Sequence, residues 1–556
     1  MERPTFTTTR RTVLEGLAAS GLAIGSGVVG AAHAADRPLA GPVAATRYGR
    51  VAGFLRNGVA LFLGVPYGAP TGSARRFLPP VPPQPWIQVR DATRLGQRAP
   101  QASGRIYENP MIGPYMTGGR DQELVAMREP EGEDCLVLNV LTPATAGRRP
   151  VLVYIHGGGF SSGSGAVMTL ADRLVAEEDV VLVTVNHRLG ALGFLYLGDV
   201  SLRFAAGNPG MLDLVAALRW VRDNICAFGG DPAKVTIFGE SGGAAKVGLL
   251  AAMPQAQGLF RAAILESGLL PAPIPIDAAV NLRNKALGDM ALDSADPAAL
   301  RGLDVTSLTA AGIAAGPVAD GRTLVSAPWA TAPATAAGVP MIVGYCADEA
   351  TLFAGVPDRS TFTLDWEGLP AKLTDKLGRS DPGLSDVVQA YRVAWPADDA
   401  SDILFRIVSD ATFGRDMVHI AERKARQRPP VYYYRFDYDT GLAPGLRAFH
   451  TAELPLIGRM VAQPRAERLS RDLAGAWAAF ARTGDPNRPG LPQWAPFIPG
   501  SCDVMMFDEV SRFGRDPQIL ARRELYSVLG DAAVPFIPSA GKPDSDSAKP
   551  SSAASN

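Results

Sequence analysis

The sequence predicts an α/β fold with a mostly parallel central sheet flanked by helices. Apolar runs of strand length recur along the chain, for example within residues 150–160 and 179–190. Between such runs, residues 211–228 place apolar side chains at every third or fourth position, which is typical of a helix. Continuously apolar strands that alternate with helices indicate a parallel sheet buried on both faces.

The expected elements follow one another in a regular order. Residues 48–70 read as short strands with a hairpin at Asn57-Gly58, because this pair favours the tight turns of hairpins. Further strands are expected within residues 135–143, 150–160, 179–190, 234–239, 260–268, 340–349 and 430–438, and helices within 211–228 and 241–253. Residues 270–340 and 355–425 are helix-prone and read as insertions over the sheet.

The first 34 residues have the features of an export signal. Arg10 and Arg11 precede a Gly/Ala-rich apolar run, and Ala32-His33-Ala34 forms a small-x-small cleavage site. The stretch around the arginine pair resembles the twin-arginine signal of bacterial export. An uncleaved membrane anchor is the alternative, which the glycine content and the cleavage site disfavour. We therefore expect an exported, periplasmic or secreted protein with no stable membrane insertion after signal removal.

The composition is that of an ordinary globular protein, with 47% hydrophobic and 20% charged residues and a formal net charge of −1. The chain has no excess of basic residues, so its charge does not indicate a nucleic-acid partner or binding to an anionic membrane surface. One domain is expected over residues 35–538. Residues 539–556 have almost nothing to bury and are expected to be a disordered tail.

The four cysteines lie far apart and show neither a CxxC pair nor a Cys/His spacing typical of a metal site. Twin-arginine export generally carries proteins that have already folded in the reducing cytoplasm. We therefore expect free thiols, no metal and no cofactor. The cysteines are Cys135, Cys226, Cys346 and Cys502.

A Gly-x-Ser-x-Gly motif at residues 239–243 joins a predicted strand to a predicted helix. In this context the motif is typical of a nucleophilic serine on a tight turn, here Ser241. The glycines are needed because the turn leaves no room for Cβ atoms, and the helix behind it adds a positive dipole end. The alternative is a structural serine at an ordinary junction, and the motif alone does not decide.

A run of three glycines, Gly157 to Gly159, ends the strand at residues 150–155. Backbone N–H groups in such a run can bind the oxyanion of a tetrahedral intermediate, together with the N–H after the nucleophile. A flexible turn is the alternative for the glycine run alone. Its combination with the serine motif downstream favours an oxyanion site.

A serine nucleophile of this kind nearly always uses a histidine base, and the chain has five histidines. His33 lies in the signal, His156 beside the glycine run, and His187 and His419 read as structural. His450 lies in an irregular stretch after a predicted strand, where catalytic residues often occur. We therefore favour His450 as the base.

An acid that orients the histidine is expected between serine and histidine in the chain order of α/β-hydrolases. Asp348 and Glu349 follow a predicted strand in this interval. Glu349 lies 108 residues after Ser241 and 101 before His450, which leaves room for further elements. The residues alone do not choose between the two adjacent carboxylates.

Several longer stretches together carry a resemblance to a known family. They include FLGVPYGAP, RRFLPPVPP, EDCLVLNV, HGGGF, VTVNHRLGALGF, VTIFGESGG, GLFRAAILESG, VGYCADEATLF and HTAELPLIG. With these, the chain resembles the type-B carboxylesterase/lipase family of the α/β-hydrolase superfamily, in particular its bacterial para-nitrobenzyl-esterase-like members. The resemblance covers almost all of the chain after the signal. It implies an α/β-hydrolase fold with helical insertions that form a gorge.

The resemblance also implies roles for single residues. Ser241 would be the nucleophile, His450 the base and Glu349, second in the family's Asp-Glu pair, the acid. It implies oxyanion donors at Gly158, Gly159 and Gly242, a buried carboxylate near the histidine at Glu240, and a supporting polar residue at Ser267. A small-molecule ester as substrate, no cofactor and a monomeric chain complete what it implies.

Three positions depart from the family pattern. Gly242 stands where relatives commonly have alanine, so we expect its N–H to be available and the turn to be looser. His187 replaces the tyrosine of the family's NYRLG. Cys135 has no upstream cysteine with which to pair, which favours the reduced state.

The function expected is that of a serine carboxylesterase acting on short-chain or aryl esters. Residues 104–119 resemble the variable loop at the gorge mouth of relatives, and their tyrosines and methionines suit an apolar ester, although ordinary loop packing explains them equally well. Three alternatives stay open: a lipase, an acyltransferase or thioesterase on the same triad, and a non-catalytic binding relative.

Overall fold

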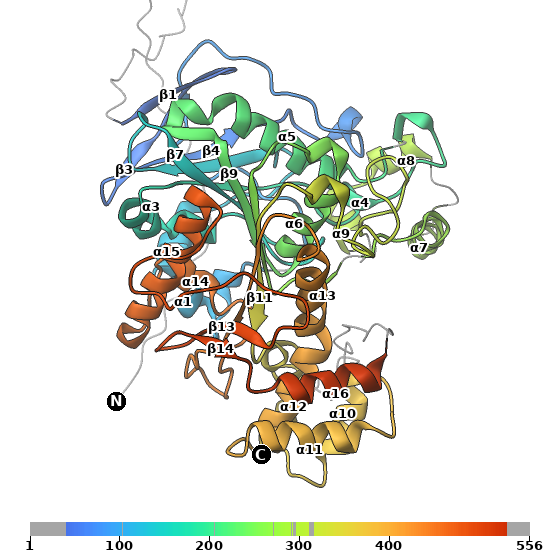
Figure 1. The fold of residues 1–556 in the computed structure, drawn as a ribbon. Coiled ribbons are helices and arrows are strands. Elements are labelled where there is room, and N and C mark those ends of the chain that lie inside the picture. The colour runs from blue at the N-terminus through green and yellow to red at the C-terminus, as the bar shows by residue number, and fades with distance from the viewer. Residues whose placement is uncertain are drawn as a thin grey trace, which may run out of the picture. The chain divides into compact units, whose positions relative to one another are not determined.

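A central sheet organises the protein (Figure 1). The computed structural model describes residues 41–102, 104–204, 206–270, 272–290, 292, 296–310 and 316–530. Within these residues the sheet has eleven strands. In spatial order they are β14 (Arg512–Arg515), β13 (Asp503–Phe507), β12 (Val431–Phe436), β11 (Met341–Cys346), β10 (Ala262–Glu266), β9 (Gly230–Glu240), β7 (Arg149–Ile155), β8 (Val181–Val185), β6 (Val137–Thr142), β4 (Val59–Pro66) and β3 (Phe54–Arg56).

The strands from β13 to β8 run parallel, and the strands at both edges run antiparallel. Every predicted strand between residues 135 and 438 is present in this sheet. A small second sheet pairs β1 (Val43–Thr46), β2 (Gly49–Ala52) and β5 (Arg90–Asp91). The predicted α/β class with a mostly parallel sheet is confirmed.

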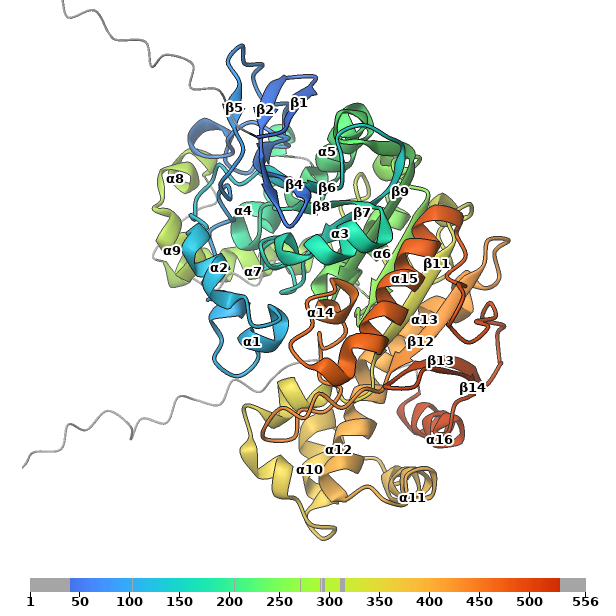
Figure 2. The same ribbon diagram turned by 90° about the vertical axis from the view of Figure 1, so that its left-hand side faces the viewer.

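Helices and helical turns connect the strands and cover the sheet (Figure 2). They are α1 (Gly113–Met116), α2 (Asp121–Met127), α3 (Asp172–Glu178), α4 (Gly190–Phe194), α5 (Pro209–Asn224), α6 (Gly242–Ala252), α7 (Ile276–Asp289), α8 (Pro297–Gly302), α9 (Val305–Ala310), α10 (Leu369–Leu377), α11 (Leu384–Ala394), α12 (Ala400–Ser409), α13 (Arg415–Lys424), α14 (Leu454–Ile457), α15 (Glu467–Thr483) and α16 (Ile519–Leu529).

Strand β7 shows why the strands are apolar throughout. Val151, Val153 and Ile155 pack in one buried cluster with residues of α5, α6 and α13. Leu152 and Tyr154 point the other way, into a second cluster with residues of α3 and α15. Successive side chains of a strand face opposite sides, so a sheet covered on both faces needs apolar residues at every position.

Two local predictions are confirmed. Asn57 and Gly58 have φ values of 51° and 80° and connect β3 to β4 as an antiparallel hairpin. Helix α5 continues into a 3₁₀ turn, Ile225–Phe228, and ends where Gly229 adopts a left-handed conformation with φ of 77°.

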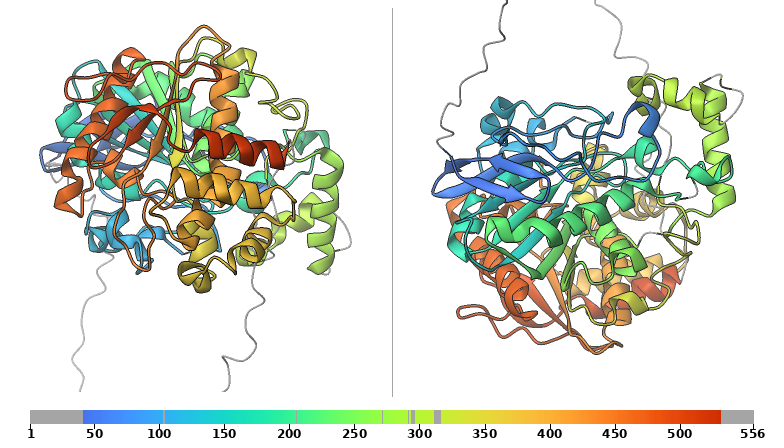
Figure 3. Two further views of the ribbon diagram at one scale, coloured as in Figure 1. Left: turned by 60° about the horizontal axis from the view of Figure 1, so that its bottom comes forward. Right: turned by 90° about the horizontal axis from the view of Figure 1, so that it is seen from above.

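The insertions predicted around residues 270–340 and 355–425 are helical. Helices α7, α8 and α9 form one group beside α4, with their own small apolar cluster. Helices α10, α11 and α12 form a second group, which packs on α16 near the carboxyl ends of the central strands (Figures 1 and 3). The signal predicted at residues 1–34, the tail at 539–556 and both ends of the predicted domain lie outside the described residues.

Candidate active site

Ser241 occupies the turn between β9 and α6 in an unusual backbone conformation. Its φ of 57° and ψ of −124° lie in a region that non-glycine residues rarely adopt, at a cost of about 1–3 kcal/mol. The turn is tight on both sides: a Cβ at Gly239 would lie 2.6 Å from the Ile155 carbonyl oxygen, and one at Gly243 would lie 2.1 Å from it. The Gly-x-Ser-x-Gly motif therefore holds Ser241 on a strained elbow at the wall of a cavity.

His450 and Glu349 are brought together by adjacent parallel strands. Glu349 follows β11 and His450 follows β12, and the Glu349 carboxylate contacts His450 Nδ1. The second oxygen of Glu349 accepts a 2.8 Å hydrogen bond from the Cys346 amide. Both side chains are buried, with His450 only 2% exposed. An imidazole whose Nδ1 faces a fixed carboxylate presents Nε2 to the cavity side.

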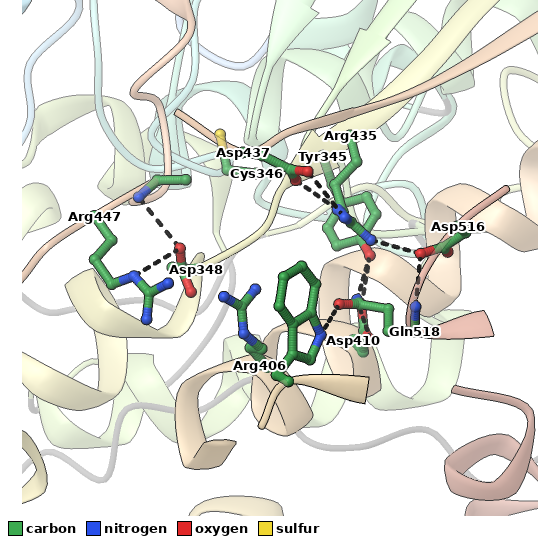
Figure 4. Close-up of polar contacts among 12 residues, drawn as sticks. Tyr345, Cys346, Asp348, Arg406, Asp410, Arg435, Asp437, Arg447, Asp516 and Gln518 are labelled. Atoms are coloured by element: carbon green, nitrogen blue, oxygen red, sulfur yellow. Dashed lines mark hydrogen bonds and ion pairs between the residues drawn. The ribbon is translucent and has the colours of Figure 1, made fainter. Parts of the chain in front are cut away.

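Asp348 faces a different partner from its neighbour Glu349. Its carboxylate accepts from the Ala448 amide at 3.3 Å and lies 3.7 Å from Arg447 Nε, as Figure 4 shows. Burial raises the pKa of Asp348, and the nearby arginines oppose this shift. The geometry thus distinguishes the two carboxylates between which the residues alone could not choose. Glu349 contacts the histidine, whereas Asp348 contacts the loop that precedes His450.

The Nε2 side of His450 faces Glu240. Nε2 lies 3.0 Å from Glu240 Oε1, but the contact does not have hydrogen-bond geometry, and within the described residues Nε2 has no hydrogen-bond partner. Burial raises the pKa of Glu240 well above its usual range, and the neighbouring glutamates raise it further. Ser241 and His450 line the same cavity without a hydrogen bond between them.

Two aromatic rings hold the His450 imidazole from its sides. The ring centroids of Phe353 and Phe413 lie 4.7 and 4.6 Å from that of His450. Phe413 belongs to a π-helical turn, Asp410–Gly414, between α12 and α13. Inserted π turns occur often at functional sites, because the extra residue redirects a side chain.

A buried polar network fixes the start of this π turn (Figure 4). The Asp410 carboxylate accepts hydrogen bonds from Tyr345 of β11, Tyr391 of α11 and Gln518 beside α16. Nearby, Arg435 of β12 forms ion pairs with Asp437 and Asp516. These contacts join the helical insertion to the sheet and hold the turn that carries Phe413.

The glycine loop, defined here as residues 156–160, lies against the start of α6. Gly158 and Gly159 have φ values of 79° and 60°, and within the described residues their amide N–H groups make no hydrogen bond. Gly242 is the first residue of α6, where helix N–H groups have no partner one turn earlier. A Cβ at Gly242 would lie 2.4 Å from N, Cα and O of Gly159. Glycine at this position therefore permits a close approach of the two backbone segments, and the looser turn expected from the sequence stays a prediction.

A cluster of buried acidic groups lies behind the histidine. Glu453 accepts a hydrogen bond from Cys346 Sγ at 2.8 Å and one from Ser267 Oγ at 3.4 Å, and Glu266 accepts from Trp477 Nε1 at 2.6 Å. Burial raises the pKa of Glu266 well above its usual range and that of Glu453 as well. Ser267 thus supports Glu453 rather than His450. Sequence reasoning gave Glu266 and Glu453 no role, although both lie in stretches that resemble the family, because no local pattern shows that they are buried behind the histidine.

The cavity beside Ser241 has a volume of about 880 Å³. This size is typical of small-molecule sites, which are mostly apolar with a few polar groups. Residues 104–109 of the loop singled out in the sequence line it. Its other apolar lining includes Met116, Phe160, Leu269, Leu270, Leu352, Phe353 and Phe413.

Other kinds of site are not found in the part of the chain that the structure describes. No group of three or more His, Cys, Asp or Glu side chains there could hold a metal ion. No described helix is both long and apolar enough to cross a membrane. All four cysteines are unpaired, with Cys135 and Cys346 buried.

Comparison with known proteins shows the family to which the chain belongs. The model of the carboxylesterase family matches residues 40–518. The para-nitrobenzyl esterase of Bacillus subtilis and the phenmedipham hydrolase of Pseudarthrobacter oxydans are each 33% identical, over 88% of this chain and 99% of their own length. The crystal structure of a Geobacillus stearothermophilus carboxylesterase superposes with a TM-score of 0.73 and 35% identity, over 87% of this chain and 99% of the other. The protein belongs to the carboxylesterase family of α/β-hydrolases and is a carboxylic ester hydrolase.

Proposed function

We propose that this esterase works by acyl transfer through Ser241, with His450 as the base and Glu349 as the acid that orients it. The observation that carries the proposal is the shared cavity: Ser241 on its strained elbow and His450, held by Glu349, both line it. Their hydrogen bond forms when substrate binds, because such contacts are often long or misaligned without a ligand and tighten in the complex.

The reaction has two steps. His450 takes the hydroxyl proton as Ser241 Oγ attacks the ester carbonyl, and the same proton then goes to the departing alcohol. Water attacks the acyl-enzyme and gives a proton to His450, which returns it to Ser241 Oγ as the acid leaves. In both steps the amides of Gly158, Gly159 and Gly242 bind the oxyanion, each donor contributing about 3 kcal/mol.

The substrates proposed are short-chain or aryl carboxylic esters. The cavity suits them because its lining is apolar and partly aromatic, with Phe353 and Phe413 beside His450. The two similar enzymes are named for para-nitrobenzyl ester and phenmedipham hydrolysis, which supports an aryl-bearing substrate.

Hydrolysis of p-nitrophenyl esters of graded chain length tests the proposal. Ser241→Ala is expected to lose activity on every ester, whereas the matched control Ser360→Ala, at an exposed position, keeps it. Full activity of Ser241→Ala would refute the nucleophile. Activity that rises only on emulsified long-chain esters would indicate a lipase, and preferred transfer to an added alcohol would indicate an acyltransferase.

We also propose that residues 1–34 direct export by the twin-arginine route and that the mature chain, with its domain at 35–538 and its tail at 539–556, acts as a monomer. The arginine pair and the small-x-small site support the first part. Replacing Arg10 and Arg11 by lysine should retain the protein in the cytoplasm, and light scattering of the mature protein measures its mass.

A further inference from the structure

Lys246 is a buried lysine directly beneath the glycine loop. It lies in α6, five residues after Ser241, and is 0% exposed. Its ammonium donates a 3.0 Å hydrogen bond to the carbonyl of His156 and lies 5.6 Å from the ring centroid of Phe160. The described residues place no carboxylate within ion-pair distance of it. A buried ammonium without an anionic partner is costly, so its presence needs an explanation.

The two histidines near Lys246 are neutral, so Lys246 supplies the positive charge among these groups. His156, after β7, and His187, after β8, pack with ring centroids 4.7 Å apart. Their Nδ1 atoms contact the carbonyls of Gly157 and Arg188. Burial and the charge of Lys246 lower the pKa of His156 to about 3 and that of His187 well below its usual range, so both rings are neutral. His187 is one of the positions that depart from the family pattern.

The carbonyl that Lys246 holds begins the glycine loop. The His156–Gly157 peptide is planar, so fixing its oxygen also fixes the orientation of its N–H. Gly158 and Gly159 follow directly, in left-handed conformations that only glycine adopts readily. The other end of the loop is held by a 2.8 Å hydrogen bond from the Gly190 amide to the Phe160 carbonyl. Lys246 thus anchors the first residue of the loop.

We infer that Lys246 is a positioning residue of the glycine loop: its ammonium fixes the His156 carbonyl and places a positive charge behind the amides that bind the oxyanion. The inference rests on the proposed function, in which those amides act. A cation fixed in a water-poor region stabilises a developing negative charge more strongly than it would in water. The substrate does not touch Lys246, which acts through the loop.

The inference predicts a characteristic pH dependence. Burial lowers the pKa of Lys246 to about 7, and Glu240, from β9, opposes this shift where it is ionised. His156 and His187, the other titratable groups that face it, are neutral throughout this range. Lys246 is charged below about pH 7 and loses its charge above it. The kcat of the native enzyme should therefore fall several-fold between about pH 6 and about pH 9.

Lys246→Met tests the inference, because methionine keeps the length of the side chain but removes the charge and the donor. We expect kcat on p-nitrophenyl butyrate to fall about 10-fold at pH 6, with KM changed less than about twofold, since the effect is on the transition state. The alkaline fall in kcat should disappear as well. Lys246→Gln, which keeps a donor without charge, should recover part of kcat but not the pH dependence.

Lys424→Met is the matched control. Lys424 is also buried and also donates to a carbonyl, that of Ala336 at 2.9 Å, but it lies in α13 and does not line the cavity. We expect it to keep the native kcat and pH profile. An equal loss of kcat in both lysine variants would indicate a general structural effect and overturn the inference.

The remaining outcomes are also decisive. Native kcat and pH profile in Lys246→Met, together with an inactive Ser241→Ala, would refute the role of Lys246 and leave the proposed function intact. An active Ser241→Ala would refute the proposed function instead. If neither lysine variant folds, the native enzyme decides, because a kcat that stays constant from about pH 6 to about pH 9 contradicts the inference.

Discussion

Replacing Gly242 with alanine tests the close approach between the serine elbow and the glycine loop. The added Cβ would lie 2.4 Å from three backbone atoms of Gly159, about 1 Å short of the 3.4 Å at which ordinary contact begins. Backbone atoms cannot rotate away as the tip of a side chain can. The glycine loop must therefore move by about 1 Å, at a cost of about 1–3 kcal/mol for an overpacked site.

A shift of this size displaces the amides of Gly158 and Gly159, which we propose bind the oxyanion, from the place where that oxyanion would form. Misplacing reacting groups by about 1 Å can cost about 100-fold in rate, so we expect kcat to fall about 10- to 100-fold. KM should change less, because the ground-state ester depends less on these amides. Steady-state hydrolysis of p-nitrophenyl butyrate gives both constants, and thermal unfolding gives the stability.

Gly248→Ala provides the control on the same helix. A Cβ there would lie no closer than 3.4 Å to its nearest neighbour, Trp329 Nε1. Alanine is also the better helix former, so this variant should be at least as stable as the native protein and equally active. If Gly242→Ala kept kcat within about twofold of the native value, the loop would be able to yield freely, and the reasoning from its contact with Gly159 would fail.

Four further substitutions separate the roles of other buried groups. Glu349→Gln should lower kcat/KM by about 10³- to 10⁴-fold, the effect of losing the acid of a triad, whereas Asp348→Asn should change it less than about threefold in the same assay. Lys246→Met should raise the free energy of unfolding at about pH 6 by about 2 kcal/mol. Removing the buried ammonium gains about 5 kcal/mol, and leaving the His156 carbonyl without its donor loses about 1–3 kcal/mol of that gain. Urea unfolding measures the difference, and a destabilised variant would contradict the prediction. Asp410→Ala should lower that free energy by about 3 kcal/mol, since Tyr345, Tyr391 and Gln518 lose their shared acceptor, and an unchanged urea midpoint would count against the network.

The sequence predicts most of the fold because its strongest signals are local. Continuous apolar runs of strand length, such as residues 150–155, favour strands buried on both faces, and the turn at Asn57-Gly58 depends on only these two residues. The pairing of Glu349 with His450 is predicted by the family resemblance. The residues alone left Asp348 equally possible, because the direction in which each carboxylate points depends on how the strands' ends pack.

The contacts that the residues alone do not predict, and that only the family resemblance could imply, join residues far apart in the chain. The approach of Glu240 to His450, and that of Gly242 to Gly159, arise only when separate strands lie side by side in the sheet. Lys246 shows the same limit in another way. A lysine within an Ala/Gly-rich helix looks like a solvent-facing position, and only the tertiary packing of α6 under the glycine loop reveals that it is buried.

The buried acids behind the histidine couple folding to proton uptake. The pKa values of Glu240, Glu266 and Glu453 are raised mainly by burial, so the folded chain keeps protons that the unfolded chain releases above its ordinary carboxyl range. Their contribution to stability is complete in acid and is lost as the pH rises through the folded pKa values. Unfolding at a pH between the unfolded and the folded pKa values therefore releases protons to the solvent, and the heat measured by calorimetry will depend on the ionisation enthalpy of the buffer that receives them.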